Sequence, residues 1–143
     1  MPAIRFFEED ISYKLKNKTA VRQWIVEALQ AEGYKVKELS YVFCSDNYLL
    51  QINQQYLNHD TYTDIITFDN SEKANNISGD IFISIDRIRE NSGKLGLTET
   101  DELHRVMVHG ALHLAGYKDK TPADKKKMTF KEDFYLNKRS FIT

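Results

Sequence analysis

Apolar residues along this chain follow two spacings, and each spacing predicts one kind of element. Short runs rich in β-branched and aromatic residues predict strands at residues 3–7, 36–45, 64–68 and 79–85. Apolar residues that recur every three or four positions predict helices at residues 19–33, 46–57, 86–97 and 98–115, and again after residue 121. This alternation predicts one α+β domain over residues 1–143, in which a small mixed sheet of about four strands is packed with helices.

Polar residues at the expected helix ends support these boundaries. Asp46, Thr98 and Thr121 each precede a helical run, so each is expected to cap the N-terminus of its helix. Pro122 follows at the first helical position, which tolerates proline. Gly33 follows the first helical run and supplies its stop.

The helix at residues 98–115 carries the clearest chemical signal. His109 and His113 are four residues apart, so they lie one turn apart on one face, where two imidazoles can share a cation. The rest of this helix is mostly apolar or small, which is typical of a buried helix. A polar group buried without a partner costs roughly 2–7 kcal/mol by transfer estimates. The pair therefore predicts a metal-binding helix at the centre of the domain. Histidines that are simply hydrogen-bonded in the core are the alternative.

The end of this helix supplies a candidate third ligand. Gly116 lies just past the apolar run, where a glycine allows a helix to end in a left-handed turn. A reversal of the chain there brings Asp119 back toward His113. Two imidazoles and one carboxylate leave a fourth position open for water, which is the arrangement of catalytic zinc. The same ligands also suit other divalent transition metals.

The run from His109 to Tyr117, HGALHLAGY, resembles the signature H-G-x-L-H-L-x-G-Y-D-H of the YbeY family. That family consists of bacterial metal-dependent endoribonucleases involved in ribosomal RNA maturation, and the three histidines of its signature hold a zinc ion. Here Lys118 stands at the position of the family's aspartate and Asp119 at that of its third histidine. The resemblance implies one divalent cation, expected to be zinc, with His109, His113 and Asp119 as ligands.

The resemblance also implies a function and a setting. The expected activity is cleavage of single-stranded RNA by a metal-dependent endoribonuclease, in ribosomal RNA processing and ribosome quality control. The expected partners are ribosomal RNA precursors and the ribosome or its proteins. A divalent cation suits this chemistry because it lowers the pKa of bound water from about 15.7 to near 7 and can polarise a phosphoryl oxygen.

The resemblance extends through the middle of the chain. The family shows L-N-x-x-y-R, then T-D-V-L-S-F, and later G-D-I. The corresponding residues here are Ile52-Asn53 with Tyr56, then residues 63–68 (TDIITF), then residues 79–81 (GDI). Leu57 stands at the position of the family's arginine. His59 lies two residues further on, where a solvated loop histidine is expected.

Two acidic residues are candidate catalytic groups. Asp64 follows Thr63 at the entrance of an apolar strand, and such a pair alone is typical of a capped turn. The resemblance instead places Asp64 near the metal cleft, where it would position the substrate. Glu102 precedes His109 by seven residues, on the same helical stripe. It is expected either to accept the second ring N–H of a metal-bound histidine or to interact with the helix dipole.

A basic cluster follows the metal-binding motif and comprises Lys118, Lys120 and residues 125–127. Lysines in such a run commonly form a solvated face. Their place next to the candidate ligands makes Lys118, Lys120 and Lys125 our candidates for holding the phosphates of the substrate.

The overall composition indicates the class of protein, the kind of RNA contact and the cellular location to expect. With 41% apolar and 29% charged residues, the 143-residue chain is typical of a globular protein. The formal net charge of −1 gives no general basic bias, so any RNA contact must depend on a local patch. Cys44 is the sole cysteine and lies in an apolar run, which predicts a buried thiol and suits a reducing cytoplasm. We find no membrane-length apolar run and no export signal, so a cytoplasmic protein without a membrane partner is expected.

Two other functions stay open. In zinc peptidases, a glutamate beside the first histidine of H-E-x-x-H acts as general base, and Gly110 occupies that position here. A peptidase or deacetylase would thus need a base from elsewhere. The second alternative is a ribosome-assembly factor in which the metal is structural and no RNA is cut.

Overall fold

The computed structural model describes residues 3–58 and 63–142 of the chain. The strands in this part are β1 (Ile4–Glu8), β2 (Lys35–Cys44), β3 (Ile65–Asp69) and β4 (Asn76–Ser84). The helices are α1 (Lys18–Ala31), α2 (Asp46–Leu57), α3 (Ile85–Leu95), α4 (Glu99–Leu114) and α5 (Pro122–Leu136). The predicted α+β fold with a four-stranded mixed sheet is therefore confirmed.

The four strands form one sheet in the order β1-β2-β4-β3. β2 runs parallel to both β1 and β4, whereas β3 pairs with β4 in the antiparallel sense. α1 connects β1 to β2, which is the kind of crossover that parallel neighbours require. In the register of the sheet, Tyr41 lies opposite Ile81 and Phe43 opposite Ile83, so these side chains share one face.

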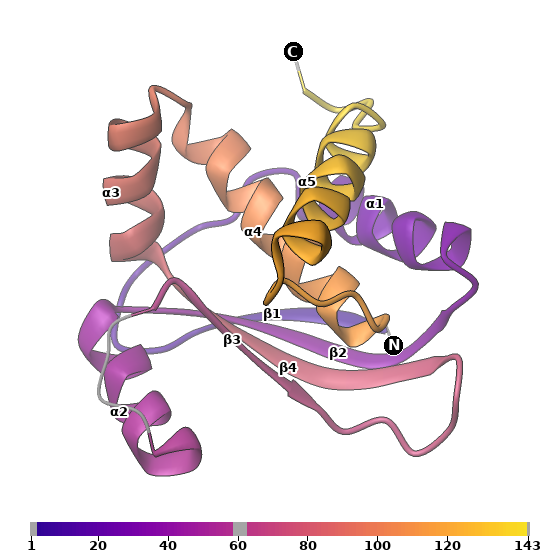
Figure 1. Cartoon of the computed structure of the whole chain (residues 1–143). Helices are drawn as coiled ribbons and strands as arrows, with labels where there is room; N and C mark the ends of the chain where they lie inside the picture. The colour runs from indigo at the N-terminus through magenta and orange to yellow at the C-terminus, as the bar shows by residue number, and fades with distance from the viewer. Residues whose placement is uncertain (1–2, 59–62, 143) are drawn as a thin grey trace.

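Helices cover the two faces of the sheet unequally (Figure 1). α1, α4 and α5 pack over the face that carries Tyr41 and Ile81, and their buried residues form the larger core cluster. α2 lies on the opposite face, where Leu49 packs with Cys44 and Ile66 in a smaller cluster. α4 contacts α1, α3, α5, β3 and β4, so the helix with the two histidines is the centre of the fold, as predicted.

Two glycines allow very close approaches around α4. A Cβ added at Gly110 would lie 2.8 Å from the Cδ1 atom of Ile65 and 3.1 Å from side-chain atoms of Ile81. A Cβ at Gly79 would lie 2.5 Å from the backbone oxygen of Phe68. A glutamate at position 110 would therefore point into the sheet, which gives a packing reason for the departure from the peptidase motif.

Some element boundaries differ from those predicted. Asp46 is not the N-cap of α2: the Oγ atom of Ser45 accepts from the Tyr48 amide at 3.1 Å, and Asp46 is the first helical residue. The Asp46 carboxylate instead accepts from Ser84 at 2.9 Å and from Arg87 at 3.1 Å, since a carboxylate also serves longer-range partners. β4 begins three residues before the predicted Gly79, because residues 76–78 pair with the start of β2. The caps predicted at Thr98 and Thr121 are confirmed.

No helix within residues 3–58 and 63–142 has the length and hydropathy needed to cross a bilayer.

Two glycine-to-alanine substitutions should change stability in opposite directions. Gly79→Ala should lower the free energy of unfolding by about 1–3 kcal/mol, because the new methyl group would overlap a backbone oxygen in a paired strand. Gly93 lies within α3 with no other atom within 4 Å of an added Cβ. Gly93→Ala should therefore raise this free energy by about 0.5–1 kcal/mol. Urea denaturation of both variants measures the two changes, and equal effects would contradict this account of Gly79.

Candidate metal centre

The two histidines of α4 and the loop after it meet at one point. The Nε2 atoms of His109 and His113 each lie 3.4 Å from the Oδ2 atom of Asp119. The ligand atoms of these three residues all lie within 4.8 Å of one another, and the side chains are partly buried. The two imidazole rings are nearly perpendicular, at 82°, with their centroids 4.6 Å apart. The structure thus brings together the three residues that the sequence indicated as ligands.

A helix-ending turn places Asp119 beside the histidines. α4 stops at Leu114, and Gly116 adopts a φ of +99°, in the left-handed region that favours glycine. The amide of Tyr117 donates to the Leu112 carbonyl at 3.0 Å, and the amide of Gly116 donates to the His113 carbonyl at 3.0 Å. These two bonds define a Schellman motif. The motif reverses the chain, so that Asp119 returns to the histidine face.

The distances from the two histidines to Asp119 suit a tetrahedral cation. Zinc binds imidazole nitrogen and carboxylate oxygen at about 2.0–2.2 Å, so neighbouring ligands of a tetrahedral site lie roughly 3.3–3.5 Å apart. Both histidine-to-aspartate distances, at 3.4 Å, fall in this range. Ordinary N–H···O hydrogen bonds are shorter, with a mode of about 2.9–3.0 Å. The residues present therefore fit a divalent cation.

The second ring nitrogen of each histidine has its own acceptor. Nδ1 of His109 lies 2.6 Å from Oε2 of Glu132, and Nδ1 of His113 lies 2.9 Å from the carbonyl oxygen of Tyr117. A proton on each Nδ1 satisfies both contacts and leaves both Nε2 lone pairs facing Asp119. The expectation that Glu102 accepts from a metal-binding histidine is wrong for this geometry, because Glu132 on α5 reaches His109 instead.

Glu132 is buried on the inner face of α5 and is fixed from a second side. Its Oε1 atom accepts from Nη1 of Arg105 at 2.9 Å, so this carboxylate joins an arginine and a histidine of α4. Burial acts to lower the pKa of His109, but the hydrogen bond and charge of Glu132 outweigh it, and the net pKa is raised. Sequence reasoning missed this residue. The available signal was a glutamate in the buried stripe formed by Met128 and Tyr135.

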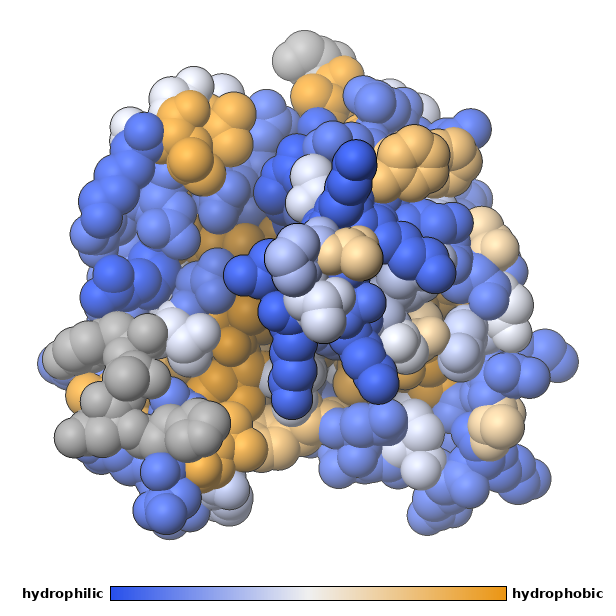
Figure 2. All heavy atoms as spheres, in the orientation of Figure 1, coloured by the Kyte–Doolittle hydropathy of each residue, from blue (hydrophilic) through white to orange (hydrophobic). Residues whose placement is uncertain are grey.

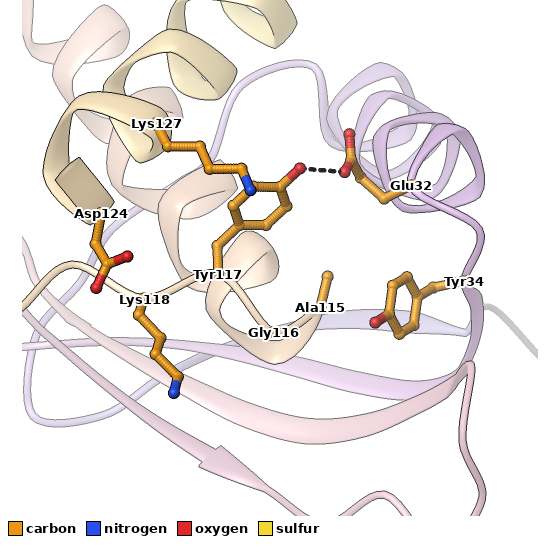
Figure 3. Close-up of a pocket in the computed structure, with 8 residues that line it drawn as sticks. All are labelled: Glu32, Tyr34, Ala115, Gly116, Tyr117, Lys118, Asp124 and Lys127. Atoms are coloured by element: carbon orange, nitrogen blue, oxygen red, sulfur yellow. Dashed lines mark hydrogen bonds between the residues drawn. The ribbon is translucent and has the colours of Figure 1, made fainter.

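The turn that carries Asp119 is also fixed, through the side chain of Tyr117. The Tyr117 hydroxyl donates to Oε1 of Glu32, at the end of α1, at 2.6 Å (Figure 3). The other oxygen of Glu32 accepts from Nζ of Lys131 at 3.0 Å and from the Tyr135 hydroxyl. Glu32 therefore ties the metal loop to α1 and α5. The same Tyr117 residue provides the carbonyl that orients His113.

A family model described as Endoribonuclease YbeY matches residues 4–140 of this chain. The chain belongs to the YbeY family.

Named relatives of the YbeY family match over most of their length. An endoribonuclease YbeY from Cytophaga hutchinsonii is 54% identical over 138 residues, which cover 96% of this chain and 96% of that protein. The endoribonuclease YbeY of Flavobacterium psychrophilum is 48% identical, with 89% of this chain and 90% of that protein covered. A protein from Thermotoga maritima, known from a solution structure, has a TM-score of 0.64 and 26% identity; the match covers 94% of this chain and 87% of that one.

Two acidic side chains, the partly buried Asp64 and the buried Glu102, lie near the candidate metal centre in this YbeY-family protein. The pKa of Asp64 is raised, first by burial and then by Asp119, against the opposing effects of its own backbone, His109 and Arg87. Burial also raises the pKa of Glu102, with the charges of Asp64 and Glu132 adding to the effect. Glu102 is 5% exposed, and its Oε1 atom has no hydrogen-bond partner among the described residues. Both shifts favour the neutral acid, which avoids a concentration of unpaired negative charge.

The candidate lysines are separated by the structure. Lys118, Lys120 and Lys125 are all exposed, and Figure 2 shows hydrophilic residues gathered around the start of α5. Lys118 lines a pocket beside the metal loop, together with Lys127. Lys120 and Lys125 are not among the residues that line it. The predicted cluster thus contains two members that line a pocket, Lys118 and Lys127, whereas Lys120 and Lys125 are exposed outside it.

The remaining histidines stand apart from the three ligands. His104 is buried on another side of α4, where its ring lies 5.6 Å from the rings of Trp24 and Phe141. Nη1 of Arg139 donates to its Nδ1 atom at 2.8 Å, which requires Nδ1 to be unprotonated. His59, expected in a solvated loop, lies outside the described residues.

Replacing Glu132 should weaken metal binding. Glu132→Gln keeps the shape of the side chain but removes the charge that orients His109, and partners of this kind typically account for 10–100-fold in metal affinity. A competition titration with a chromophoric zinc chelator measures the affinity. Asp133→Asn is the matched control, because Asp133 also pairs with Arg105, at 2.6 Å, but makes no contact with His109. Equal affinities in the two variants would contradict the assigned role.

The buried His104 should make stability depend on pH. Burial, with the Arg139 charge, lowers its pKa to about 4, against an ordinary value of 6.5. Between these values the unfolded chain binds the extra proton, so stability falls as pH decreases, by on the order of 3 kcal/mol when pH 4 is reached. Unfolding of metal-free protein from pH 7 to 4.5 should show a steeper loss for the native chain than for His104→Asn. An equal loss of stability with falling pH in both proteins would contradict this role of His104.

Proposed function

We propose that this protein is a metal-dependent endoribonuclease that cuts single-stranded RNA in ribosomal RNA processing and ribosome quality control. One observation carries the proposal: two oriented imidazoles and one carboxylate converge at the spacing of a three-ligand cation site, in a chain of the endoribonuclease YbeY family. Three protein ligands leave a coordination position for water or substrate, as catalytic sites do. A closed structural site would need a fourth protein ligand.

We propose zinc as the cation, held by His109, His113 and Asp119. Two imidazole nitrogens, each 3.4 Å from one carboxylate oxygen, support this choice. When bound, the cation supplies Lewis acidity for a phosphoryl oxygen and lowers the pKa of water to near 7. The contribution of the chain is to hold the two imidazoles in the correct tautomer, through Glu132 and the Tyr117 carbonyl.

Asp64 is the residue that we propose for proton exchange and substrate positioning. Its charge interacts with those of His109 and Asp119, and its raised pKa brings the carboxyl nearer to the range in which it can both hold and release a proton. Glu102 is a buried acid whose charge interacts with that of Asp64, and its Oε1 atom has no hydrogen-bond partner in the part of the chain that the structure describes; we propose that it tunes the charge of the site. Lys118, Lys120 and Lys125 are proposed to attract and hold phosphates of the RNA.

The cellular setting is proposed on the same basis. The family resemblance points to precursors of ribosomal RNA as substrates, and to the ribosome or its proteins as partners. The buried single thiol of Cys44, whose pKa is raised to about 12 mainly by burial, suits the reducing cytoplasm that we propose as its location.

Substitutions at the centre should separate metal binding from cleavage. His113→Ala and Asp119→Ala should each lose the bound cation and the cleavage of single-stranded RNA. Asp64→Asn should keep the cation but cut RNA about 10²–10⁴-fold more slowly, because proton transfer typically contributes that factor. Metal content per chain by plasma mass spectrometry and cleavage of a labelled RNA on gels are the two measurements.

His104→Asn is the control for this experiment, since it removes an imidazole from the same helix but away from the ligands. It should keep both metal and activity at pH 7. Full cleavage by His113→Ala would refute the proposal. A native protein that binds RNA and zinc but cuts no RNA would favour the non-catalytic assembly factor, and hydrolysis of casein or acetyl-peptides with RNA intact would favour a peptidase or deacetylase.

A further inference from the structure

A pocket of about 330 Å³ lies beside the loop that carries Asp119 (Figure 3). It is formed where the end of α1, the turn after α4 and the start of α5 meet. Ligand sites typically measure roughly 300–1,000 Å³, so this pocket suits a small ligand of about nucleotide size. Tyr117 and Lys118 line it, and the next residue along the chain is Asp119. The carbonyl of Tyr117 also accepts from Nδ1 of His113 at 2.9 Å, so the pocket and the candidate metal centre share this residue.

Two aromatic residues form walls of this pocket, and both are held in place. Tyr34 follows α1, and its amide donates to the Leu29 carbonyl at 2.9 Å. Its ring is partly buried and packs against the main core cluster. Tyr117 is held by its hydrogen bond to Glu32. Rigid aromatic walls are the surfaces on which bases of single-stranded RNA stack.

Between these walls the main chain is open. Gly116 lines the pocket without a side chain, and a Cβ added there would meet only the Tyr34 hydroxyl, at 3.9 Å. Its φ of +99° strains any other residue, so the turn that places Asp119 also leaves this surface free. A planar group can therefore lie against the backbone at this position.

The charges around the pocket favour an anion. Lys118 and Lys127 both line it and are exposed, and Nζ of Lys127 lies 5.6 Å from the centre of the Tyr117 ring. Glu32 also lines it, but its charge is balanced by Lys131 and by the two tyrosine hydroxyls. Asp124 lies in the first turn of α5, where the helix dipole offsets its charge. The dipole offsets only part of the Asp124 charge, so the two lysines leave a net positive charge to meet a ligand.

We propose that this pocket is a subsite for one nucleotide of the RNA strand, next to the phosphodiester at the metal centre. The base stacks on Tyr34, and Lys118 with Lys127 holds the adjoining phosphate. This inference rests on the proposed RNA substrate and adds where one neighbouring nucleotide binds. The volume, the aromatic walls and the two lining lysines together favour a nucleotide over a bare phosphate ion.

Binding of an RNA probe tests the stacking part. The probe is a fluorescein-labelled uridylate decamer with phosphorothioate linkages, and the titrated protein is zinc-loaded. Loss of one stacking ring typically weakens binding roughly 5-fold or more, so Tyr34→Leu should show that change in fluorescence anisotropy. Tyr34→Phe keeps the ring and should bind within about twofold of the native chain, because stacking uses the π-face rather than the hydroxyl. Native-like affinity of Tyr34→Leu would overturn the proposal.

The salt dependence of binding tests the phosphate part. One phosphate contact contributes about 0.7 to the slope of log K against log salt for single strands. Lys127→Ala should reduce the slope by about that amount. Lys14→Ala is the matched control, because Lys14 lines a separate hollow next to the first turn of α4, and it should leave the slope unchanged. Equal slopes for both lysine variants would overturn the proposal, even if Tyr34→Leu proved too unstable to use.

Two further readouts distinguish the alternatives. Uridine monophosphate should displace the probe from native protein at concentrations at which inorganic phosphate does not. Equal displacement by both would show a simple anion site and overturn the nucleotide assignment. Cleavage of unmodified RNA is followed in parallel: absent cleavage with Tyr34- and Lys127-dependent binding would refute the nuclease function while supporting the subsite. If the native protein cleaves RNA and both Tyr34→Leu and Lys127→Ala bind the probe as it does, the result would support the nuclease function and refute the subsite.

Discussion

The rest of this structure depends on one requirement: every ring nitrogen of the two histidines on α4 needs a partner. Each ring has two nitrogens, and one left without a partner in a buried setting is costly. His109 satisfies Nδ1 with Glu132, and His113 satisfies Nδ1 with the Tyr117 carbonyl. Both Nε2 atoms are then available for one shared partner. A cation with Asp119 meets that requirement, whereas Asp119 alone, at 3.4 Å from each, does so poorly.

Three helices, α1, α4 and α5, fix the partners of the histidines, so the position of each helix affects the site. Glu132 reaches His109 because Arg105 holds α5 against α4. Tyr117 is held because Glu32 ends α1 at the right place. Gly110 allows α4 to pack closely on β3 and β4, and this packing fixes the distance of the two histidines from the sheet. Substitutions far from the ligands can therefore alter metal binding through helix position alone.

Local patterns were enough to predict the elements, but not the contacts between them. The spacing of His109 and His113, with Gly116 and Asp119, predicted the ligand set because a helical turn and a Schellman reversal are local geometry. Glu132 is 23 residues from His109, and nothing local specifies how α5 lies across α4. Glu102 lies on the same helical stripe as His109, but the group that accepts from Nδ1 of His109 is Glu132 on α5. The prediction of Asp46 as N-cap was wrong for a similar reason. Ser45 caps α2 instead, and the Asp46 carboxylate binds Arg87, which lies far away in the sequence.

The departures from the family signature change the charge of the site in a consistent way. The signature has an aspartate followed by a histidine, with a formal charge of −1 when the histidine is neutral; here Lys118 and Asp119 have a formal charge of zero. The proposed third ligand is therefore anionic, which would reduce the positive charge that a bound cation presents to a phosphate. The residue before it has become cationic, which restores positive charge on the exposed side of the loop. Because Lys118 also lines the neighbouring pocket, the restored charge lies where a nucleotide would approach, rather than on the metal itself. In the proposed site, metal binding and attraction for phosphate are therefore divided between two adjacent residues, Asp119 and Lys118.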